Sequence, residues 1–179
     1  MSKGIIVLTI LIVTATVFGY YYMNDKLHFD WINQNRINIS SSSTHYSNNG
    51  NDREKNHHEY KFDNNGSLTV ANINGLVTVK THNKDTLILN SIKRGSKDDF
   101  DKLETKTEVS SSTANISAHY LENNVNASID FHIHVPEGTT MSSVSSTNGA
   151  IRIVGTSNEV VANTTNGTIN IAPKVISQS

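Results

Sequence analysis

Apolar and polar residues alternate along much of the second half of the chain. A period of two is typical of a β-strand with one buried and one solvated face. Shorter alternations occur at Ile116–Tyr120 and Leu87–Leu89, and Pro136 ends the longest one. The pattern predicts an all-β domain over residues 61–179. The longest run places Val125, Ala127, Ile129, Phe131, Ile133 and Val135 on the buried face and Asn126, Ser128, Asp130, His132 and His134 on the solvated face.

A repeat is superimposed on this alternation. The pattern Thr-Asn-Gly-x-Ile-x-Ile occurs at Thr147–Ile153 and again, eighteen residues later, at Thr165–Ile171. Fainter Asn-Gly pairs at Asn65–Gly66 and Asn74–Gly75 also lead into alternating segments. Each unit is one turn and one short strand, which is too small to bury a core alone. We therefore expect the units to stack as in a solenoid.

Alignment of the two clear units predicts which residues lie side by side. Stacked isoleucines would form the interior, stacked asparagines can share hydrogen bonds, and glycine would supply a positive φ at each corner. An antiparallel β-sandwich is the main alternative. The Asn-Gly turns argue against it, because they recur at a fixed spacing that would stack each turn on an identical one. The expected neighbours are Val144 and Ala162, Ser146 and Thr164, Asn148 and Asn166, Ile151 and Ile169, and Ile153 and Ile171. The expected structural turn residues are Asn74, Gly75, Asn148, Gly149, Asn166 and Gly167.

The beginning of the chain has a different pattern. Residues 4–23 are almost wholly apolar and carry no charge, and Tyr20–Tyr22 lie near the end of this segment. About twenty apolar residues match the thickness of a bilayer, and aromatic rings favour the membrane interface. We expect residues 1–23 to be a signal anchor that makes the chain a single-pass protein of the cell membrane, with its C-terminal domain extracytoplasmic. The alternative is a signal peptide whose cleavage releases a secreted protein.

Residues 24–60 are polar. They include the runs Ser40–Thr44 and Asn48–Asn51 and contain few apolar side chains. Such a segment cannot bury enough apolar surface to offset the entropy of ordering. We expect a disordered tether between the membrane and the domain.

One short helix is expected within the β-domain. Ser96 can cap a first turn that contains Asp99 three residues later, ahead of the apolar Phe100. The acidic residues around it lack the spacing and central glycine of a calcium loop, so a solvated helix start is the better interpretation.

Composition and charge exclude several functions. The formal net charge is −1, so the chain lacks the excess of lysine and arginine that is typical of a nucleic-acid-binding protein. It contains no cysteine, which excludes disulfides and thiol chemistry. No phosphate-binding loop or nucleophile elbow is readable, and we expect no cofactor.

Two groups of side chains could carry chemistry. Asp130, His132 and His134 share the solvated face of one strand, and imidazole and carboxylate both ligate zinc, although a closed site usually needs a fourth ligand. A solvated face is the simpler interpretation. Asp130 together with Glu137 is the only carboxylate pair that suggests sugar cleavage.

Three segments resemble a known family. Val135–Gly138 begins with the pattern Val-Pro-Glu-Gly, and Ser145–Gly155 and Thr164–Ile171 repeat the Asn-Gly-x-Ile-x pattern. In this order they resemble the DUF4097 group of adhesin-like proteins, and Asn72–Val79 resembles the first coil of that family. The resemblance implies a single-stranded parallel β-helix, outside the cytoplasm and behind a membrane anchor, with no catalytic residues.

These observations lead to one functional expectation and two alternatives. We expect a non-enzymatic, membrane-tethered β-helix protein outside the cytoplasm, with an adhesin-like, structural or accessory role in the envelope. An extracellular polymer or an envelope protein would be its partner, and the open end of the solenoid could join two copies, since an exposed strand edge invites association. The alternatives are an exported polysaccharide-active enzyme on a β-helix scaffold and a metal-binding surface domain.

Overall fold

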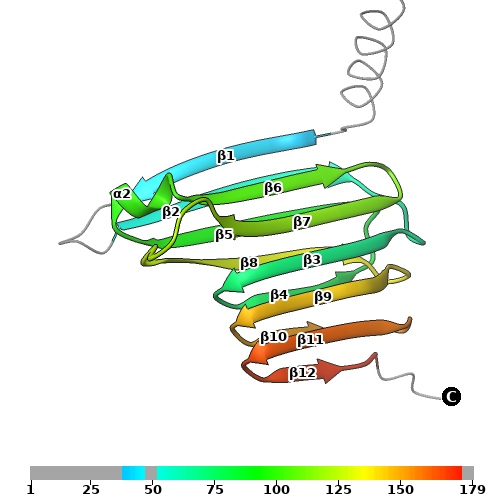
Figure 1. Cartoon of the computed structure of the whole chain (residues 1–179). Coiled ribbons are helices and arrows are strands. Elements are labelled where there is room, and N and C mark those ends of the chain that lie inside the picture. The colour runs from blue at the N-terminus through cyan, green and yellow to red at the C-terminus, as the bar shows by residue number, and fades with distance from the viewer. Residues whose placement is uncertain (1–37, 47–51, 175–179) are drawn as a thin grey trace, which may run out of the picture. The chain divides into compact units, whose positions relative to one another are not determined.

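The computed structural model describes residues 38–46 and 52–174, all within the unit that spans residues 36–179. The expected anchor in residues 1–23 lies outside the described residues. Within the described ranges, no helix has both the length and the apolar character needed to cross a membrane. The predicted all-β class is confirmed (Figure 1). The elements are β1 (Asn38–Tyr46), β2 (Asp52–Lys61), β3 (Ser67–Asn74), β4 (Val77–His82), β5 (Thr86–Gly95), α2 (Lys97–Phe100), β6 (Leu103–Val109), β7 (Thr113–Tyr120), β8 (Ala127–Pro136), β9 (Thr140–Asn148), β10 (Ile151–Val154), β11 (Val160–Asn166) and β12 (Ile169–Ala172).

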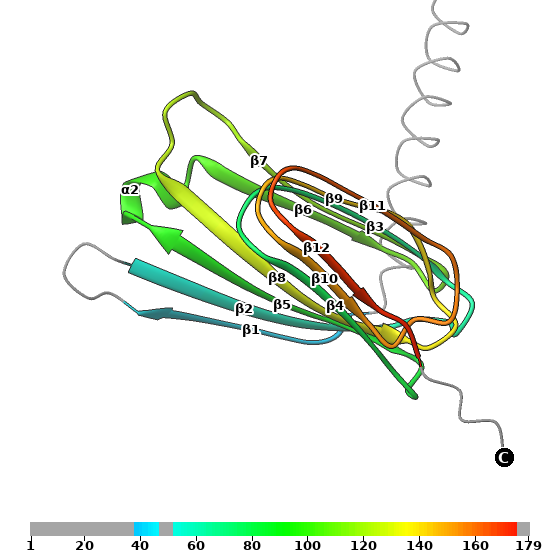
Figure 2. The same ribbon diagram turned by 90° about the horizontal axis from the view of Figure 1, so that it is seen from below.

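The strands form two sheets that face each other. Sheet A has seven strands in the order β1-β2-β5-β8-β4-β10-β12, and sheet B has five in the order β11-β9-β3-β7-β6. Figure 2 shows the two layers and the short turns that join them at β3–β4, β9–β10 and β11–β12. Four strand pairs, which we call coils, each place one strand in either sheet: β7–β8, β3–β4, β9–β10 and β11–β12.

Neighbouring coils pair in parallel, with the register that the repeat predicts. In sheet B, Val144 pairs with Ala162, Ser146 with Thr164 and Asn148 with Asn166. In sheet A, Ile151 pairs with Ile169 and Ile153 with Ile171. All five predicted neighbours are therefore confirmed. An eighteen-residue repeat is long enough for one strand in each sheet and two turns, so it returns each residue type to the same position one coil further on.

The sheets are mixed, whereas the sequence predicted parallel strands throughout. Strands β1, β2 and β5 extend sheet A in antiparallel fashion next to β8, and β6 extends sheet B next to β7. These strands come from residues before the first coil and from the segment between β4 and β7. They carry no Asn-Gly repeat, so the pattern that predicted stacking says nothing about how they pair.

The prediction of a tether in residues 24–60 is wrong for β1 and β2. Strand β2 pairs residue for residue with β5, from Asp52 with Gly95 to Lys61 with Thr86, and β1 pairs with its other edge. The inward positions of β2 are mostly polar, so its composition resembles that of a linker. Backbone hydrogen bonds to β5 satisfy its peptide groups without requiring apolar side chains.

The coils do not stack in chain order. The coil β3–β4 lies between β7–β8 and β9–β10, because Val77 pairs with Phe131 on one side and with Ile151 on the other. In sheet B, Val70 likewise lies between Ile116 and Val144. The first coil in the sequence is thus an internal coil of the fold.

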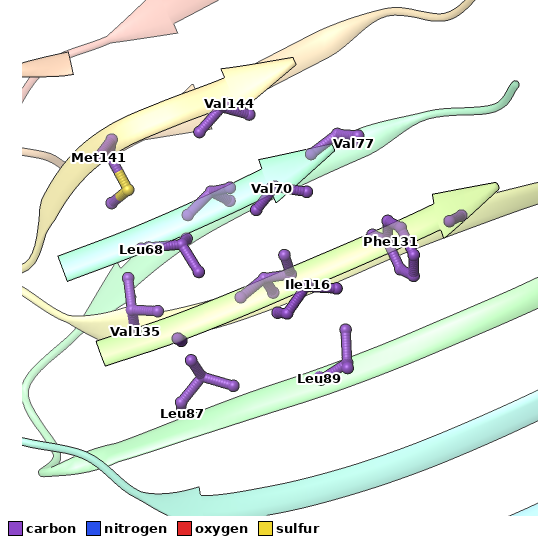
Figure 3. Close-up of a cluster of buried hydrophobic side chains, with 14 of the residues drawn as sticks. Leu68, Val70, Val77, Leu87, Leu89, Ile116, Phe131, Val135, Met141 and Val144 are labelled. Atoms are coloured by element: carbon purple, nitrogen blue, oxygen red, sulfur yellow. The ribbon is translucent and has the colours of Figure 1, made fainter. Parts of the chain in front are cut away.

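The core lies between the two sheets and is built from rows of like residues. Phe131, Val77 and Ile151 form one row, and Ile133, Val79 and Ile153 form the next. All six side chains are at most 1% exposed. Figure 3 shows Phe131 and Val77 in the shared interior, together with side chains from sheet B, such as Val70, and from β5, such as Leu89. Burying an aliphatic side chain of this size contributes about 2 kcal/mol, so this apolar interior is the main source of stability.

The predicted helix is confirmed as α2. Ser96 Oγ accepts a hydrogen bond from the Asp99 backbone N–H at 3.3 Å, and the Ser96 hydroxyl donates to the Asp99 carboxylate at 2.8 Å. Phe100 is buried at the end of this single turn. A local side-chain-to-backbone signal was sufficient for this prediction.

Glycine is required in the turns for two different physical reasons. Gly75 has φ of +123°, as predicted for a corner glycine. Gly149 and Gly167 do not have a positive φ. They are required because a Cβ on Gly149 would overlap the carbonyl oxygen of Gly75, and a Cβ on Gly167 would overlap that of Gly149. Close stacking of the turns therefore selects glycine there. The expected asparagine ladder is present, since Asn166 Nδ2 donates to Asn148 Oδ1 at 2.9 Å.

Candidate functional site

Asp130 is buried, although the strand pattern predicts that it lies on the solvated face. Its exposed fraction is 6%. The carboxylate accepts a hydrogen bond from the Leu76 backbone N–H at 3.0 Å and forms an ion pair with Arg94 on β5. The turn before β4 closes over this part of β8, which explains why alternation alone misplaced the side chain. Asp130 thus holds the turn of the first coil.

The structure does not support the metal site proposed for Asp130, His132 and His134. Among residues 38–46 and 52–174, no three histidine, aspartate or glutamate side chains gather as a metal site would require. Asp130 is engaged by Arg94 and by a backbone N–H group. A carboxylate already neutralised in this way is a poor ligand, because binding a metal would break its ion pair.

His132 and His134 do lie on the outer face of sheet A, as predicted, and both are partly buried. The rings of His134 and His82 meet edge to face, with 6.2 Å between their centroids. Burial is the first cause that lowers the pKa of His134 below its ordinary value of 6.5. The positive charges of His82, Lys80 and His132 lower this pKa further. The folded chain therefore resists protonation of His134.

These two histidines line a shallow groove of about 620 Å³ on the outer face of sheet A. It crosses strands β8, β4, β10 and β12, together with the turns that precede the last three. Exposed Lys80 and Arg152 supply two permanent positive charges, and no acidic side chain is part of the lining. We call this the basic groove. Its lining residues are Leu76, Thr78, Lys80, His132, His134, Ala150, Ile151, Arg152, Thr168 and Asn170.

The strand register explains why these groups meet. His132 pairs with Thr78, Thr78 with Arg152, and Arg152 with Asn170, so one row crosses four strands. His134 pairs with Lys80 in the next row. The sequence pattern alone does not single out Lys80 and Arg152 as part of a site. The alternation in β4 and β10 places both outward, but only the order of the strands shows that they share a face with the histidines.

The outer face of sheet B is uncharged over most of its width. Thr69 lies between Asn115 and Ser143, and Ala71 lies between Ser117 and Ser145. Asn163 continues the second row on β11. Charge is confined to the β6 edge, where His119 lies 2.6 Å from Glu104. This face offers rows of small hydrogen-bonding groups.

A second hollow, of about 510 Å³, lies where the inner faces of β2, β5 and β6 become polar. His58 Nδ1 and Thr105 Oγ1 are buried there, with no hydrogen-bond partner among the described residues. Burial, followed by the charge of His57, lowers the pKa of His58 below 6.5. The hollow marks the end of the apolar core beside the antiparallel strands.

The carboxylate pair considered for sugar cleavage does not come together. Asp130 and Glu137 are seven residues apart along the extended β8 strand and the turn after it. At roughly 3.3 Å per residue the separation is on the order of 20 Å, whereas glycosidase carboxylates lie about 5 to 9.5 Å apart. Glu137 instead forms an ion pair with Lys174 at 2.6 Å.

The last coil is an exposed end. Ile169 and Ile171 continue the core rows but are 42% and 44% exposed, and Val161 is 49% exposed. Strands β11 and β12 are the edges of sheets B and A. Their outer backbone groups and apolar rows are therefore open at this end of the described region.

Comparison with known proteins gives little further identification. The chain matches no protein-family model and no curated protein. The resemblance to the DUF4097 group thus remains a resemblance. Among solved structures, the chain is similar to one described as a putative cell adhesion protein from Clostridium sporogenes, with 10% sequence identity and a TM-score of 0.36. That similarity covers 75% of this chain and 99% of the other.

Proposed function

We propose that this chain is a non-enzymatic, adhesin-like binding protein whose sheet faces recognise an extended extracellular polymer. In this proposal the four coils are a short parallel β-helix, extended on one side by antiparallel strands. Residues 4–23 anchor the chain in the membrane, and the β-domain lies outside the cytoplasm.

One observation carries the proposal: the coils stack in register, so equivalent outward residues repeat from strand to strand. Adjacent strands in a sheet are about 4.8 Å apart, which produces a flat and regular array of side chains. Thr69 with Ser143 on sheet B, and Thr78 with Arg152 on sheet A, are examples. An extended, repetitive surface suits a polymer, because successive groups of the polymer can meet successive strands.

A polymer-binding screen tests this function. The purified full chain, in detergent, is applied to immobilised neutral and acidic polysaccharides, and the products are analysed for shortened chains. We expect saturable binding to one polymer class without its breakdown. Two exposed substitutions then locate the contact: Asn163→Lys on sheet B and Arg152→Gln on sheet A. Breakdown of the polymer would favour the enzyme alternative, and binding to none of the polymers would refute the adhesin-like role.

The membrane anchor has its own test. Cells that express the chain are treated with an external protease, and the membrane fraction is extracted at alkaline pH. We expect the β-domain to be cut from outside while the N-terminal fragment stays with the membrane. A mature N-terminus that begins after residue 19, found by N-terminal sequencing, would indicate a cleaved signal peptide instead.

We also propose that two copies join through the exposed end formed by β11 and β12. The apolar residues Ile169 and Ile171 and two open strand edges favour this arrangement. A two-fold axis would pair each edge with its own copy, so that both sheets continue across the contact and the apolar rows are covered.

A further inference from the structure

The basic groove concentrates positive charge on a chain whose formal net charge is −1. Lys80 and Arg152 lie on adjacent strands, β4 and β10, and are exposed. Thr78 separates Arg152 from His132 in one row, and Lys80 lies beside His134 in the next. Four groups that are, or can become, positive therefore converge on one hollow.

The acidic groups around the groove do not neutralise it. On β8 itself, Asp130 is paired with Arg94 of β5, so this pair has no net charge. On β2, Glu59 lies beyond β5, because it pairs with Ile88 and Ile88 pairs with His134. Besides His82 on β4, the other charged or titratable groups on the groove side of sheet A lie beyond β5, on β2 and β1: Arg53, Lys55, His57, Lys61 and Tyr46. The balance on this face is positive, which suits an anionic ligand.

The lining also indicates which kind of polyanion fits. Its uncharged polar groups are the hydroxyls of Thr78 and Thr168 and the amide of Asn170, which can bond sugar hydroxyls. The lining contains no phenylalanine, tyrosine or tryptophan ring on which a nucleobase could stack. Its shallow form across several strands accommodates an extended chain.

We propose that the basic groove binds an acidic polysaccharide, and that binding becomes tighter as the pH falls and His134 gains a proton. This inference rests on the proposed polymer-binding function and specifies the ligand class and its regulation. Lys80 and Arg152 supply the fixed charge that holds the polymer carboxylates, and His134 adds charge in acid.

The environment of His134 explains the pH dependence. In the free chain, burial and the neighbouring positive charges lower its pKa. A bound carboxylate supplies the opposite charge that the site lacks, so it favours the protonated ring. Binding should therefore take up protons, and acidification should tighten binding by the same linkage. His82 is held nearby by a hydrogen bond of 2.8 Å between its Nε2 and the Thr86 carbonyl.

The test measures the affinity of the purified full chain, in detergent, for polygalacturonate, neutral dextran and single-stranded DNA at pH 5.5 and 7.5. We expect polygalacturonate to bind about threefold more tightly at pH 5.5, since protonation of His134 adds positive charge to the groove. Each basic residue near an anionic surface contributes about 1 kcal/mol, so Lys80→Gln and Arg152→Gln should each weaken binding about fivefold.

Matched variants separate the parts of the proposal. His132→Asn combined with His134→Gln should remove the pH dependence and retain binding at pH 7.5. Lys97→Gln, an exposed charge on α2, should leave the affinity unchanged. Circular dichroism of each variant verifies that it is folded.

Four results would overturn the inference. Binding of polygalacturonate that is unaffected by the Lys80 and Arg152 changes would place the ligand elsewhere, and DNA binding as tight as polygalacturonate binding would refute the ligand class. Binding of dextran alone would refute the acidic ligand while leaving the general polymer-binding function intact. Failure of the folded chain to bind any polymer would refute both.

Discussion

Gly149 lies directly against Gly75 in the neighbouring coil, so that a side chain on Gly149 would overlap the Gly75 carbonyl oxygen. The Gly75 N–H also donates to the Asn148 carbonyl at 3.0 Å, which keeps the two turns in contact. The close approach of neighbouring coils therefore explains why the repeat has glycine after asparagine.

Replacing Gly149 by alanine should destabilise the domain. The added methyl group meets backbone atoms, which cannot move as a side chain can, so we expect a loss of about 3 kcal/mol in the free energy of unfolding. Urea denaturation of the purified chain measures this loss. Thr168→Ala, in the exposed turn of the last coil, is the control and should change stability by less than about 0.5 kcal/mol. Equal stability of the two variants would contradict the stacking argument.

Two asparagines of the coils should differ in importance. The Asn72 amide is buried and donates to the Ile129 carbonyl at 2.8 Å, while Asn166 makes its hydrogen bond to Asn148 at the surface. Asn72→Ala leaves a buried carbonyl without that donor and should cost about 2 kcal/mol, whereas Asn166→Ala should cost about 0.5 kcal/mol. The shift in denaturation midpoint gives both values. A larger effect at Asn166 would show that the ladder, and not the buried amide, holds the turns.

Asp130 should be a structural residue and not a metal ligand. Asp130→Ala removes the partner of Arg94 and the acceptor of the Leu76 N–H group. We expect a loss of about 2 kcal/mol, because Arg94 is partly exposed and regains water. Asp130→Asn keeps an acceptor oxygen and should lose less. Calorimetric zinc titration of the wild-type chain and Asp130→Asn is the second measurement. A zinc affinity that disappears in Asp130→Asn, without a loss of stability, would restore the metal site.

Acid should destabilise the free chain through His58 and His134. Both have a pKa below 6.5 in the folded state, so the unfolded chain binds more protons as the pH falls through this region. Stability is therefore complete above about pH 6.5 and is lost progressively below it. The melting temperature between pH 5 and 8 should show this slope, and His58→Gln or His134→Gln should reduce it. Asn170→Ala lies on the same face and does not titrate, so its slope should equal that of the wild-type chain. A slope unchanged by both histidine variants would refute this origin.

The exposed end should mediate self-association. Ile171→Lys places a charge among the open apolar row of the last coil, so it should shift the chain from dimer to monomer. Light scattering over a range of protein concentrations measures the change. Lys97→Gln on α2 serves as the matched surface control. A wild-type chain that is monomeric at all concentrations would exclude this contact.

The part of the fold that the sequence predicts depends on local and periodic signals. The repeat gave the partners of Ile151 and Asn148, alternation gave the buried face of β8, and Ser96 with Asp99 gave the helix. Each of these depends on residues close in sequence or on a fixed spacing. The order of the coils depends on contacts such as Val77 with Phe131, for which no spacing rule exists.

The candidate site was less predictable for the same reason. His132 and His134 were found because they share one strand. Lys80 and Arg152 belong to strands that become neighbours only through the order of sheet A. Alternation places Asp130 in solvent, because it does not reveal that the Leu76 turn covers this residue. Strand β2 was missed because its pairing with β5 uses backbone groups, which composition does not report.

The internal position of β3–β4 has a consequence for how the chain folds. Val77 meets Phe131 and Ile151, which are 54 and 74 residues later in the sequence. During synthesis, this coil therefore cannot be covered on both sides until both flanking coils have been made. In ordinary solenoids each repeat can join the one made just before it. Contacts of such long sequence separation place folding at the slow, cooperative end of the range for small domains. We therefore expect the domain to fold only after the chain has been made through β10, and not when the first repeat appears.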